Sequence, residues 1–450
     1  MNITLAVHHF LPRYSAGAEI YTLRMARWLR SHGHGVHIVS IESIDQGRPG
    51  ELSVTDDSYD ELPVTRLAFN LAGADDLWRW KYTNPLLGNW FSQYLQQSPP
   101  DLIHFQAGYL LGVLPIQAAV KAGIPAILTL HDYWFLCPQI TLIQGNGQIC
   151  QEIPEDPAGC AWCLYQEKRR YSIPERLSSG LVGKIAKAHF MDSEGQKILE
   201  RRTLLQQTLR MPDAILVPSR FLYNLVSPFT TPGRLHHVRH GMDLEPFLKN
   251  TPPPRDEIFR IGYIGQIAPH KGVHLLLAAF KKLHSDGRPL ELHIFGGYKP
   301  QAGYARSLLR MASEDSRIHF HGRFENRYAP EILSRFDVSV VPSIWHEIGP
   351  LTILESFAAG TPVLASPLGN MVDLIQDGHN GLYFQPNSPD DLALKLQKLV
   401  DDPSLLEKLR SGVRLPRSQD EEMAQVTAIY DQALARHSTS TEHLSNVHTC

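Results

Sequence analysis

The chain has 450 residues, of which 43% are hydrophobic and 20% are charged, so it can build two or three folded domains. This composition excludes a disordered or fibrous chain and a small disulfide-rich peptide. Lysine and arginine number 43 and acidic residues 46, and the resulting net charge of −3 argues against binding to nucleic acids.

The start of the chain, Met1 to His9, lacks the basic segment and the long apolar core of a secretion signal. The apolar runs, such as residues 275–280, are much shorter than the roughly 20 residues that span a membrane. We therefore expect a cytoplasmic protein.

The N-terminal half alternates short apolar runs with stretches of helical spacing. A strand at 2–7, a helix at 18–32 and a strand at 35–40 form its first unit. The same pattern continues with strands at 101–105, 126–130 and 214–218 and a helix at 112–122. Such alternation predicts a parallel sheet with helices on its faces.

A basic, largely helical stretch interrupts this pattern at residues 164–210. Nine lysine and arginine residues lie between residues 165 and 202. Two interpretations stay open: a solvated helical surface, or a contact surface for an anionic acceptor or for the inner surface of a membrane.

A proline-rich stretch around residues 227–254 predicts a linker, after which the alternation restarts. Strands are expected at 260–264, 290–295, 318–320, 338–341 and 361–365, with an edge strand at 381–384 and a helix at 272–284. The sequence thus predicts two tandem doubly wound, Rossmann-like α/β domains that face each other across a cleft. The expected parts are domains at 1–245 and 246–415, a helix at 416–436 that returns to the first domain, and a flexible tail at 437–450.

Ligands of such sheets bind at the carboxyl ends of the strands, which makes the strand-to-helix segment 342–355 the most informative. Pro350 suits the first position of the helix, and the N–H groups of Leu351 and Thr352 should then point into the cleft. With the Thr352 hydroxyl as a further donor, these groups predict a phosphate site.

Two glutamates flank this helix start. Glu347 lies in the loop before it, and Glu355 lies about one turn beyond Leu351. Carboxylates beside a phosphate site can accept hydrogen bonds from sugar hydroxyls at two ends of one ligand. By spacing alone, a solvated helix face explains the same pair.

The surroundings of the two glutamates resemble a known family. Glu347 and Glu355, followed by residues 356–366, resemble the E-x7-E signature of the family 4 retaining glycosyltransferases, which have the two-domain GT-B fold. Residues 263–272 resemble the family's G-R-(x)n-K-G loop, and residues 240–243 resemble its N-G-V-D turn. Residues 15–19 resemble its G-G-x-E loop, and residues 129–134 resemble the segment with its donor-facing histidine. The resemblance covers most of residues 1–400.

This resemblance implies a role for each matching residue. Glu347, His131 and Lys271 would be the catalytic residues, with Glu347 and His131 on the donor sugar and Lys271 on the leaving diphosphate. The substrate-binding set would be Gly17, Gln266, Gly349, Pro350, Leu351, Thr352 and Glu355, with Glu355 on the ribose hydroxyls. Gln266 stands where the family usually has an arginine, so one positive charge beside the diphosphate is missing.

The implied activity is transfer of a sugar, with retention, from a UDP-, GDP- or ADP-linked donor to a hydroxyl of a glycan or lipid-linked acceptor. The resemblance implies no cofactor for catalysis. Two alternatives stay open: a sugar-nucleotide epimerase of the same fold, and a catalytically silent protein that binds sugar nucleotides. A dehydrogenase is a weak third alternative. The doubly wound fold would allow it, but residues 15–19 lack the dinucleotide-binding motif G-x-G-x-x-G.

Four of the five cysteines cluster in the sequence. Cys137, Cys150, Cys160 and Cys163 have the spacing C-x12-C-x9-C-x2-C. Four thiolates can hold a structural zinc ion, and buried free thiols are nearly as well supported by this irregular spacing. Such a zinc ion would have no catalytic task, since four thiolates leave no open position.

Overall fold

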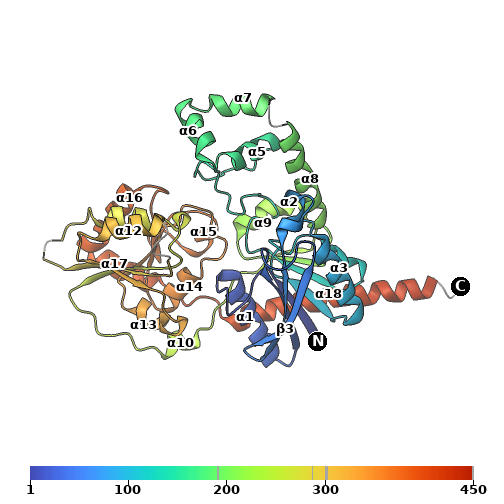
Figure 1. Cartoon of the computed structure of the whole chain (residues 1–450). Coiled ribbons are helices and arrows are strands. Elements are labelled where there is room, and N and C mark those ends of the chain that lie inside the picture. The colour runs from blue at the N-terminus through green and yellow to red at the C-terminus, as the bar shows by residue number, and fades with distance from the viewer. Residues whose placement is uncertain (190–191, 286, 299–302, 448–450) are drawn as a thin grey trace. The chain divides into compact units, whose positions relative to one another are not determined.

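The protein is described by a computed structural model that covers residues 1–189, 192–285, 287–298 and 303–447 (Figure 1). The chain forms two compact units. The N-terminal unit comprises Met1–Pro218, Leu222–Val238 and the chain from Met423 onward, and the C-terminal unit comprises Ser219–Phe221 and Arg239–Glu422. Each unit contains its own sheet.

The sheet of the N-terminal unit has the strand order β3-β4-β2-β1-β5-β6-β7-β8. Its strands are β1 (Asn2–Val7), β2 (Gly35–Ser43), β3 (Leu52–Tyr59), β4 (Leu62–Phe69), β5 (Leu102–Phe105), β6 (Ala126–Thr129), β7 (Ala214–Val217) and β8 (Leu235–His237). Only β3 and β4 pair antiparallel, and all other neighbours are parallel. The central strands β5, β6 and β7 are buried throughout, as parallel strands covered on both faces require.

The helices of this unit connect and cover the strands. They are α1 (Gly17–Ser31), α2 (Leu77–Trp80), α3 (Pro85–Gln97), α4 (Leu114–Lys121) and α9 (Arg220–Val226). The C-terminal helix α18 (Gln419–Val447) contributes Met423, Val426, Ile429 and Tyr430 to the same core as β1. The Tyr430 hydroxyl lies 2.6 Å from Nδ1 of the buried His104 on β5.

A helical insertion separates β6 from β7. It consists of α5 (Pro157–Tyr165), α6 (Arg169–Leu177), α7 (Leu181–His189) and α8 (Asp192–Thr208), which Figure 1 shows in green beside one another. Trp162 and Ile198 are buried at its centre in a small hydrophobic cluster, against which Trp78 of α2 also packs. The insertion therefore has a core separate from that of the sheet.

The C-terminal unit has an all-parallel sheet in the order β11-β10-β9-β12-β13-β14. The strands are β9 (Phe259–Ile264), β10 (Leu290–Phe295), β11 (Ile318–Gly322), β12 (Val338–Val341), β13 (Val363–Ala365) and β14 (Gly381–Tyr383). The helices are α10 (Glu245–Lys249), α11 (Val273–Phe280), α12 (Gly303–Ala312), α13 (Ala329–Ser334), α14 (Leu351–Ala358), α15 (Met371–Leu374), α16 (Pro389–Asp401) and α17 (Pro403–Gly412).

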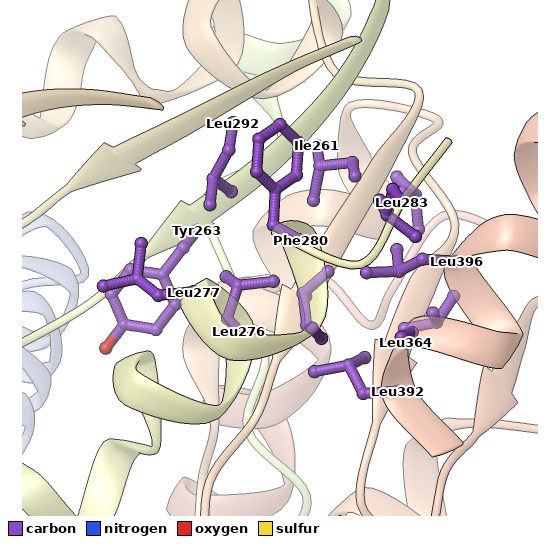
Figure 2. Close-up of a cluster of buried hydrophobic side chains, with 14 of the residues drawn as sticks. Ile261, Tyr263, Leu276, Leu277, Phe280, Leu283, Leu292, Leu364, Leu392 and Leu396 are labelled. Carbon is purple, nitrogen blue, oxygen red and sulfur yellow. The ribbon is translucent and has the colours of Figure 1, made fainter. Parts of the chain in front are cut away.

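One hydrophobic core holds the C-terminal unit together. Figure 2 shows Leu276, Leu277 and Phe280 of α11 in one cluster with Ile261 of β9 and Leu396 of α16. Because β9 and α11 share this core, the loop that joins them is fixed at the carboxyl end of the sheet.

The predicted strands and the sheet-edge position of 381–384 are confirmed, but the region around 227–254 is more structured than a linker. It contains β8 and α10, and the chain passes from the N-terminal unit to the C-terminal unit at 238/239. Helix α18 also continues to Val447, into the expected tail at 437–450, because no glycine or proline interrupts it. Among the described residues, no helix is both long and apolar enough to span a membrane.

Candidate active site

Glu347 lies in the loop between β12 and α14, at the carboxyl end of the C-terminal sheet. Its side chain is buried, with a relative exposure of 4% for the residue. Lys271, in the loop after β9, donates a hydrogen bond from Nζ to Glu347 Oε1 at 2.7 Å. Ser343 Oγ donates to the same oxygen at 2.6 Å. Two neighbouring strands thus bring a carboxylate and an ammonium group together.

The electrostatics keep this carboxylate charged. Burial raises the pKa of Glu347, but the charge of Lys271 and the hydrogen bonds from Lys271 and Ser343 outweigh burial and hold the pKa below its ordinary value. The Lys271 ammonium also lies 5.0 Å from the ring centroid of Trp345, a cation–π contact on its other side. The site therefore holds a buried ion pair at neutral pH.

Two glycines allow the backbone around this pair to pack closely. Gly272 has φ +72°, and a Cβ atom there would lie 1.8 Å from the Pro342 carbonyl oxygen. Gly369 has φ +59°, and a Cβ there would lie 2.3 Å from the Glu347 carbonyl oxygen. Glu347 O also accepts a 2.6 Å hydrogen bond from the Asn370 amide. The Glu347 loop is therefore fixed from two sides by loops that follow other strands.

Helix α14 begins one residue later than predicted. Pro350 is its N-cap instead of its first helical residue, with ψ 83°. The Leu351 amide was expected to be free for a ligand, but it donates a hydrogen bond to Gly349 O at 2.9 Å. The Thr352 hydroxyl donates to Ile264 O at 3.2 Å, so it also has a partner within the protein. A phosphate at this helix start would have to compete with both bonds.

The other candidates in this unit are Glu355, Gln266 and Gly349. Glu355 is half-buried on α14, with buried Leu354 and Ser356 beside it. Gln266 is exposed, and its carbonyl accepts a 2.8 Å hydrogen bond from the Tyr263 hydroxyl. Gly349 packs closely on His240, since a Cβ at Gly349 would lie 2.5 Å from His240 Cδ2.

The remaining two candidates belong to the N-terminal unit. His131 follows β6, where Nε2 lies 3.1 Å from Gln106 Oε1 and the ring lies 4.9 Å from that of Tyr21, edge to face. Gly17 is the first residue of α1, and a Cβ there would meet nothing within 4 Å. Both lie at carboxyl ends of parallel strands, as the sequence predicted.

Further buried polar residues lie at this end of the N-terminal sheet. Glu19 on α1 is 2% exposed, and His8 Nε2, just after β1, lies 3.5 Å from its Oε1. Burial raises the pKa of Glu19 and lowers that of His8 to about 3, so burial disfavours the charged form of both groups. Burial also raises the pKa of Asp132 to about 6. Glu19 and Asp132 lie in the segments 15–19 and 129–134 that resemble family loops, whereas no motif marks His8 as the partner of Glu19.

The four clustered cysteines are free thiols, and the structural zinc site stays a prediction. In the ranges that the structure covers, no three His, Cys, Asp or Glu side chains are grouped so that they could hold a metal ion. Instead, Cys163 Sγ accepts from the Gly145 amide at 3.3 Å, and Cys150 Sγ donates to Glu152 O at 3.2 Å. Burial raises the pKa of Cys163 to about 11.

Family comparisons cover both halves of the chain. Residues 16–150 match the model described as "Glycosyl transferase 4-like domain", and residues 246–415 match "Glycosyl transferases group 1". The second match contains Lys271, Glu347 and Glu355, and the first contains Gly17 and His131.

Related proteins and solved structures agree with these matches. The chain is 27% identical over 407 residues to a 2-deoxystreptamine glucosyltransferase of Streptomyces kanamyceticus, covering 88% of this chain and 92% of that protein. It is 27% identical over 336 residues to a D-inositol 3-phosphate glycosyltransferase of Stackebrandtia nassauensis, covering 70% of this chain and 69% of that protein.

Two solved structures superpose over nearly the whole chain. Sucrose-phosphate synthase from Thermosynechococcus elongatus superposes with a TM-score of 0.63 at 17% identity, covering 97% of this chain and all of that one. Anabaena HepE in complex with UDP and glucose gives a TM-score of 0.61 at 16% identity, with 98% and 100% covered. Together with the two parallel sheets, these matches define the protein as a glycosyltransferase of the two-domain GT-B fold.

The family models specify the group within that class. The chain belongs to glycosyltransferase family 4, with the group 1 domain in its C-terminal unit and the 4-like domain in its N-terminal unit.

Proposed function

We propose that this glycosyltransferase retains the anomeric configuration of the sugar that it transfers from a nucleotide-diphosphate donor to an acceptor hydroxyl. The observation that carries the use of such a donor is the buried Glu347 carboxylate, held ionised by Lys271 and Ser343 in the loop before α14. A fixed carboxylate suits sugar hydroxyls, and a fixed ammonium suits a diphosphate. One short loop region therefore has a partner for each half of a sugar nucleotide.

The difficult step is departure of the nucleoside diphosphate. The bond between the anomeric carbon and the diphosphate oxygen breaks, and the acceptor oxygen forms a new bond to that carbon on the same face. The acceptor proton goes to the departing phosphate oxygen, so no protein nucleophile is required. The charge that develops on this phosphate is stabilised by Lys271, whose ammonium has three donors, of which Glu347 accepts one.

The other site residues orient the donor. We propose that Glu355 accepts hydrogen bonds from the ribose hydroxyls and that Glu347 accepts from the transferred sugar. His131 would hold the sugar through the imidazole that Gln106 and Tyr21 now position. Gly17, with open space around its Cα, would let the diphosphate approach the backbone.

The donor is proposed to carry UDP, GDP or ADP, and UDP is the nucleotide bound in the HepE structure. A thermal-shift panel of UDP, GDP, ADP and CDP with their common sugars identifies the nucleotide. Proton NMR of the product from an α-linked donor then tests retention: an α-linked product is expected, and a β-linked product would contradict it.

The two alternatives have less support. The relatives and structural neighbours named above are transferases and a synthase, so an epimerase or a catalytically silent protein is not favoured. Conversion of the donor sugar in the absence of any acceptor would indicate the epimerase. Absence of donor hydrolysis and transfer despite tight nucleotide binding would indicate the silent protein.

The acceptor is proposed to be a glycan or a lipid-linked saccharide, in polysaccharide or glycolipid synthesis. A lipid-linked acceptor lies in a membrane surface, and the basic stretch at 165–202 is the proposed peripheral contact with that surface. We expect catalysis without an added cofactor, so turnover should survive treatment with EDTA.

A further inference from the structure

Helices α6 and α7 expose four large aliphatic side chains. Ile173 and Leu177 on α6 are 42% and 81% exposed, and Leu181 and Ile185 on α7 are 57% and 48% exposed. Within each helix the two residues are four positions apart, so they lie on one helical face. Apolar residues at this density on a short surface segment mark an interaction site more often than chance exposure does.

Loose packing of the two helices does not explain the exposure of these side chains. The opposite faces supply Tyr171 from α6 and Val182 and Ala186 from α7 to the cluster around the buried Trp162. Glu175 accepts hydrogen bonds from Trp162 Nε1 at 3.2 Å and from the Gly183 amide at 2.5 Å. The inner faces of both helices are therefore occupied, which leaves the aliphatic faces without a protein partner among the described residues.

Basic residues border the aliphatic faces. Residues 168–189 contain six lysines and arginines and a single acid, Glu175, in a chain whose net charge is −3. In the described ranges, none of the exposed Lys168, Arg169, Arg170, Arg176 and Lys184 forms an ion pair. By helical spacing, Arg169 and Arg176 fall beside Ile173 and Leu177, and Lys184 falls beside Leu181. The surface combines apolar side chains with uncompensated positive charge.

We propose that this α6–α7 surface, residues 168–189, docks on an anionic lipid bilayer. The aliphatic side chains would enter the boundary between head groups and acyl chains, and the basic side chains would bind lipid phosphates. An acidic protein would satisfy the charges, but four exposed aliphatic residues ringed by long basic side chains fit a bilayer surface better. The inference deepens the proposed function and rests on it in one respect, because docking brings the enzyme to the surface that holds a lipid-linked acceptor.

Vesicle flotation of the full-length protein tests this docking. Vesicles of phosphatidylcholine with 30% phosphatidylglycerol should carry the wild-type protein upward at 0.05 M salt and release it at 0.5 M salt. Vesicles of phosphatidylcholine alone should bind it much more weakly. Neutralising Arg169, Arg170 and Arg176 with glutamine should lower partitioning on the order of 100-fold, at about 5-fold per basic residue removed.

The apolar contribution is tested with Leu177→Ser/Leu181→Ser, which should lower partitioning at least about 10-fold. Leu394→Ser, at a leucine of α16 that is 66% exposed, is the matched apolar control. Lys121→Gln/Lys408→Gln removes two exposed lysines elsewhere and is the control for charge. Both controls should float like the wild type, and all variants should keep the thermal stabilisation by the nucleotide that binds the wild type.

Three results would overturn the proposal. One is a wild type that does not float with anionic vesicles at low salt. Another is flotation that is unaffected by both α6–α7 variants. The third is a wild type that does not bind vesicles but sediments as a dimer, when Leu177→Ser/Leu181→Ser sediments as a monomer. This result would assign the surface to a second copy of the chain. Nucleotide binding separates these outcomes from a failure of the proposed transferase function.

Discussion

The two domains present different kinds of loop at the carboxyl ends of their sheets. In the C-terminal domain, the Glu347 loop is fixed by Gly272, Gly369 and the hydrogen bonds from Ser343 and Asn370. In the N-terminal domain, Ser15 and Ala16 just before α1 are exposed, and a side chain at Gly17 would meet nothing within 4 Å. The C-terminal domain therefore presents charged groups fixed before a ligand binds, whereas the N-terminal domain presents backbone that a ligand can approach.

The largest expected effect is on turnover. Glu347→Gln keeps the size of the side chain but removes the charge that faces Lys271, so the sugar loses a charged acceptor. We expect turnover to fall about 100- to 1000-fold. Steady-state kinetics with the donor found in the thermal-shift panel measures the change. Glu325→Gln, at an exposed surface residue, is the control, and an equal loss in both variants would contradict a specific role.

The next effect concerns the stability of the two glycine loops. Gly272→Ala places a methyl group against Pro342 O at a positive φ, whereas Gly17→Ala fills open space. We expect Gly272→Ala to lower the free energy of unfolding by about 2–4 kcal/mol and Gly17→Ala to change it by less than about 0.5 kcal/mol. Urea unfolding of both variants measures the difference, and similar values would remove the distinction between the loops.

A smaller effect is expected at Gln266, where the family usually has an arginine. Gln266 is exposed in the loop between β9 and α11, so a longer side chain can be accommodated. Gln266→Arg should raise the affinity for the nucleoside diphosphate about 10-fold, because a guanidinium adds charge-assisted hydrogen bonds to phosphate. Calorimetric titration measures this affinity. The control is Gln385→Arg, at another exposed glutamine of the same domain. Unchanged affinity would show that position 266 does not face the diphosphate.

The smallest effect is a dependence of stability on pH. The pKa of Glu347 is held below its ordinary value of 4.5 by Lys271 and Ser343 against the opposing effect of burial. A carboxyl with a depressed pKa stabilises the fold above its unfolded pKa, and this contribution is lost as pH falls through the lower folded value. Below pH 4.5 the free energy of unfolding should therefore fall more steeply in the wild type than in Glu347→Gln. Parallel slopes in urea unfolding from pH 6 to 3 would contradict the ion pair.

Much of the fold follows from the sequence, because buried parallel strands are short apolar runs. Residues 2–7 and 338–341 were predicted as strands on this signal and are β1 and β12. The β3–β4 hairpin was missed because β3 is mostly exposed and its turn uses Asp60 and Glu61 at positive φ instead of glycine. Neither feature produces the pattern that identifies a strand or a tight turn.

The candidate site could be predicted only in part. The motifs identify Lys271, Glu347 and Glu355 because these residues lie in recognisable segments. They do not identify Ser343 or Gly369, whose contacts with Glu347 arise only after folding brings the loops together. The Leu351 amide shows the same limit, because Gly349 accepts its hydrogen bond through a turn that the sequence does not signal.

Nucleotide affinity, measured by calorimetry for the wild type, Glu355→Gln and Glu347→Gln side by side, tests the central claim most directly. If Glu355 binds the ribose and Glu347 the sugar, the nucleoside diphosphate should bind at least about 10-fold more weakly to Glu355→Gln and within about 3-fold of wild type to Glu347→Gln. Equal affinity in all three proteins, or no binding by the wild type, would contradict the site described for the C-terminal domain.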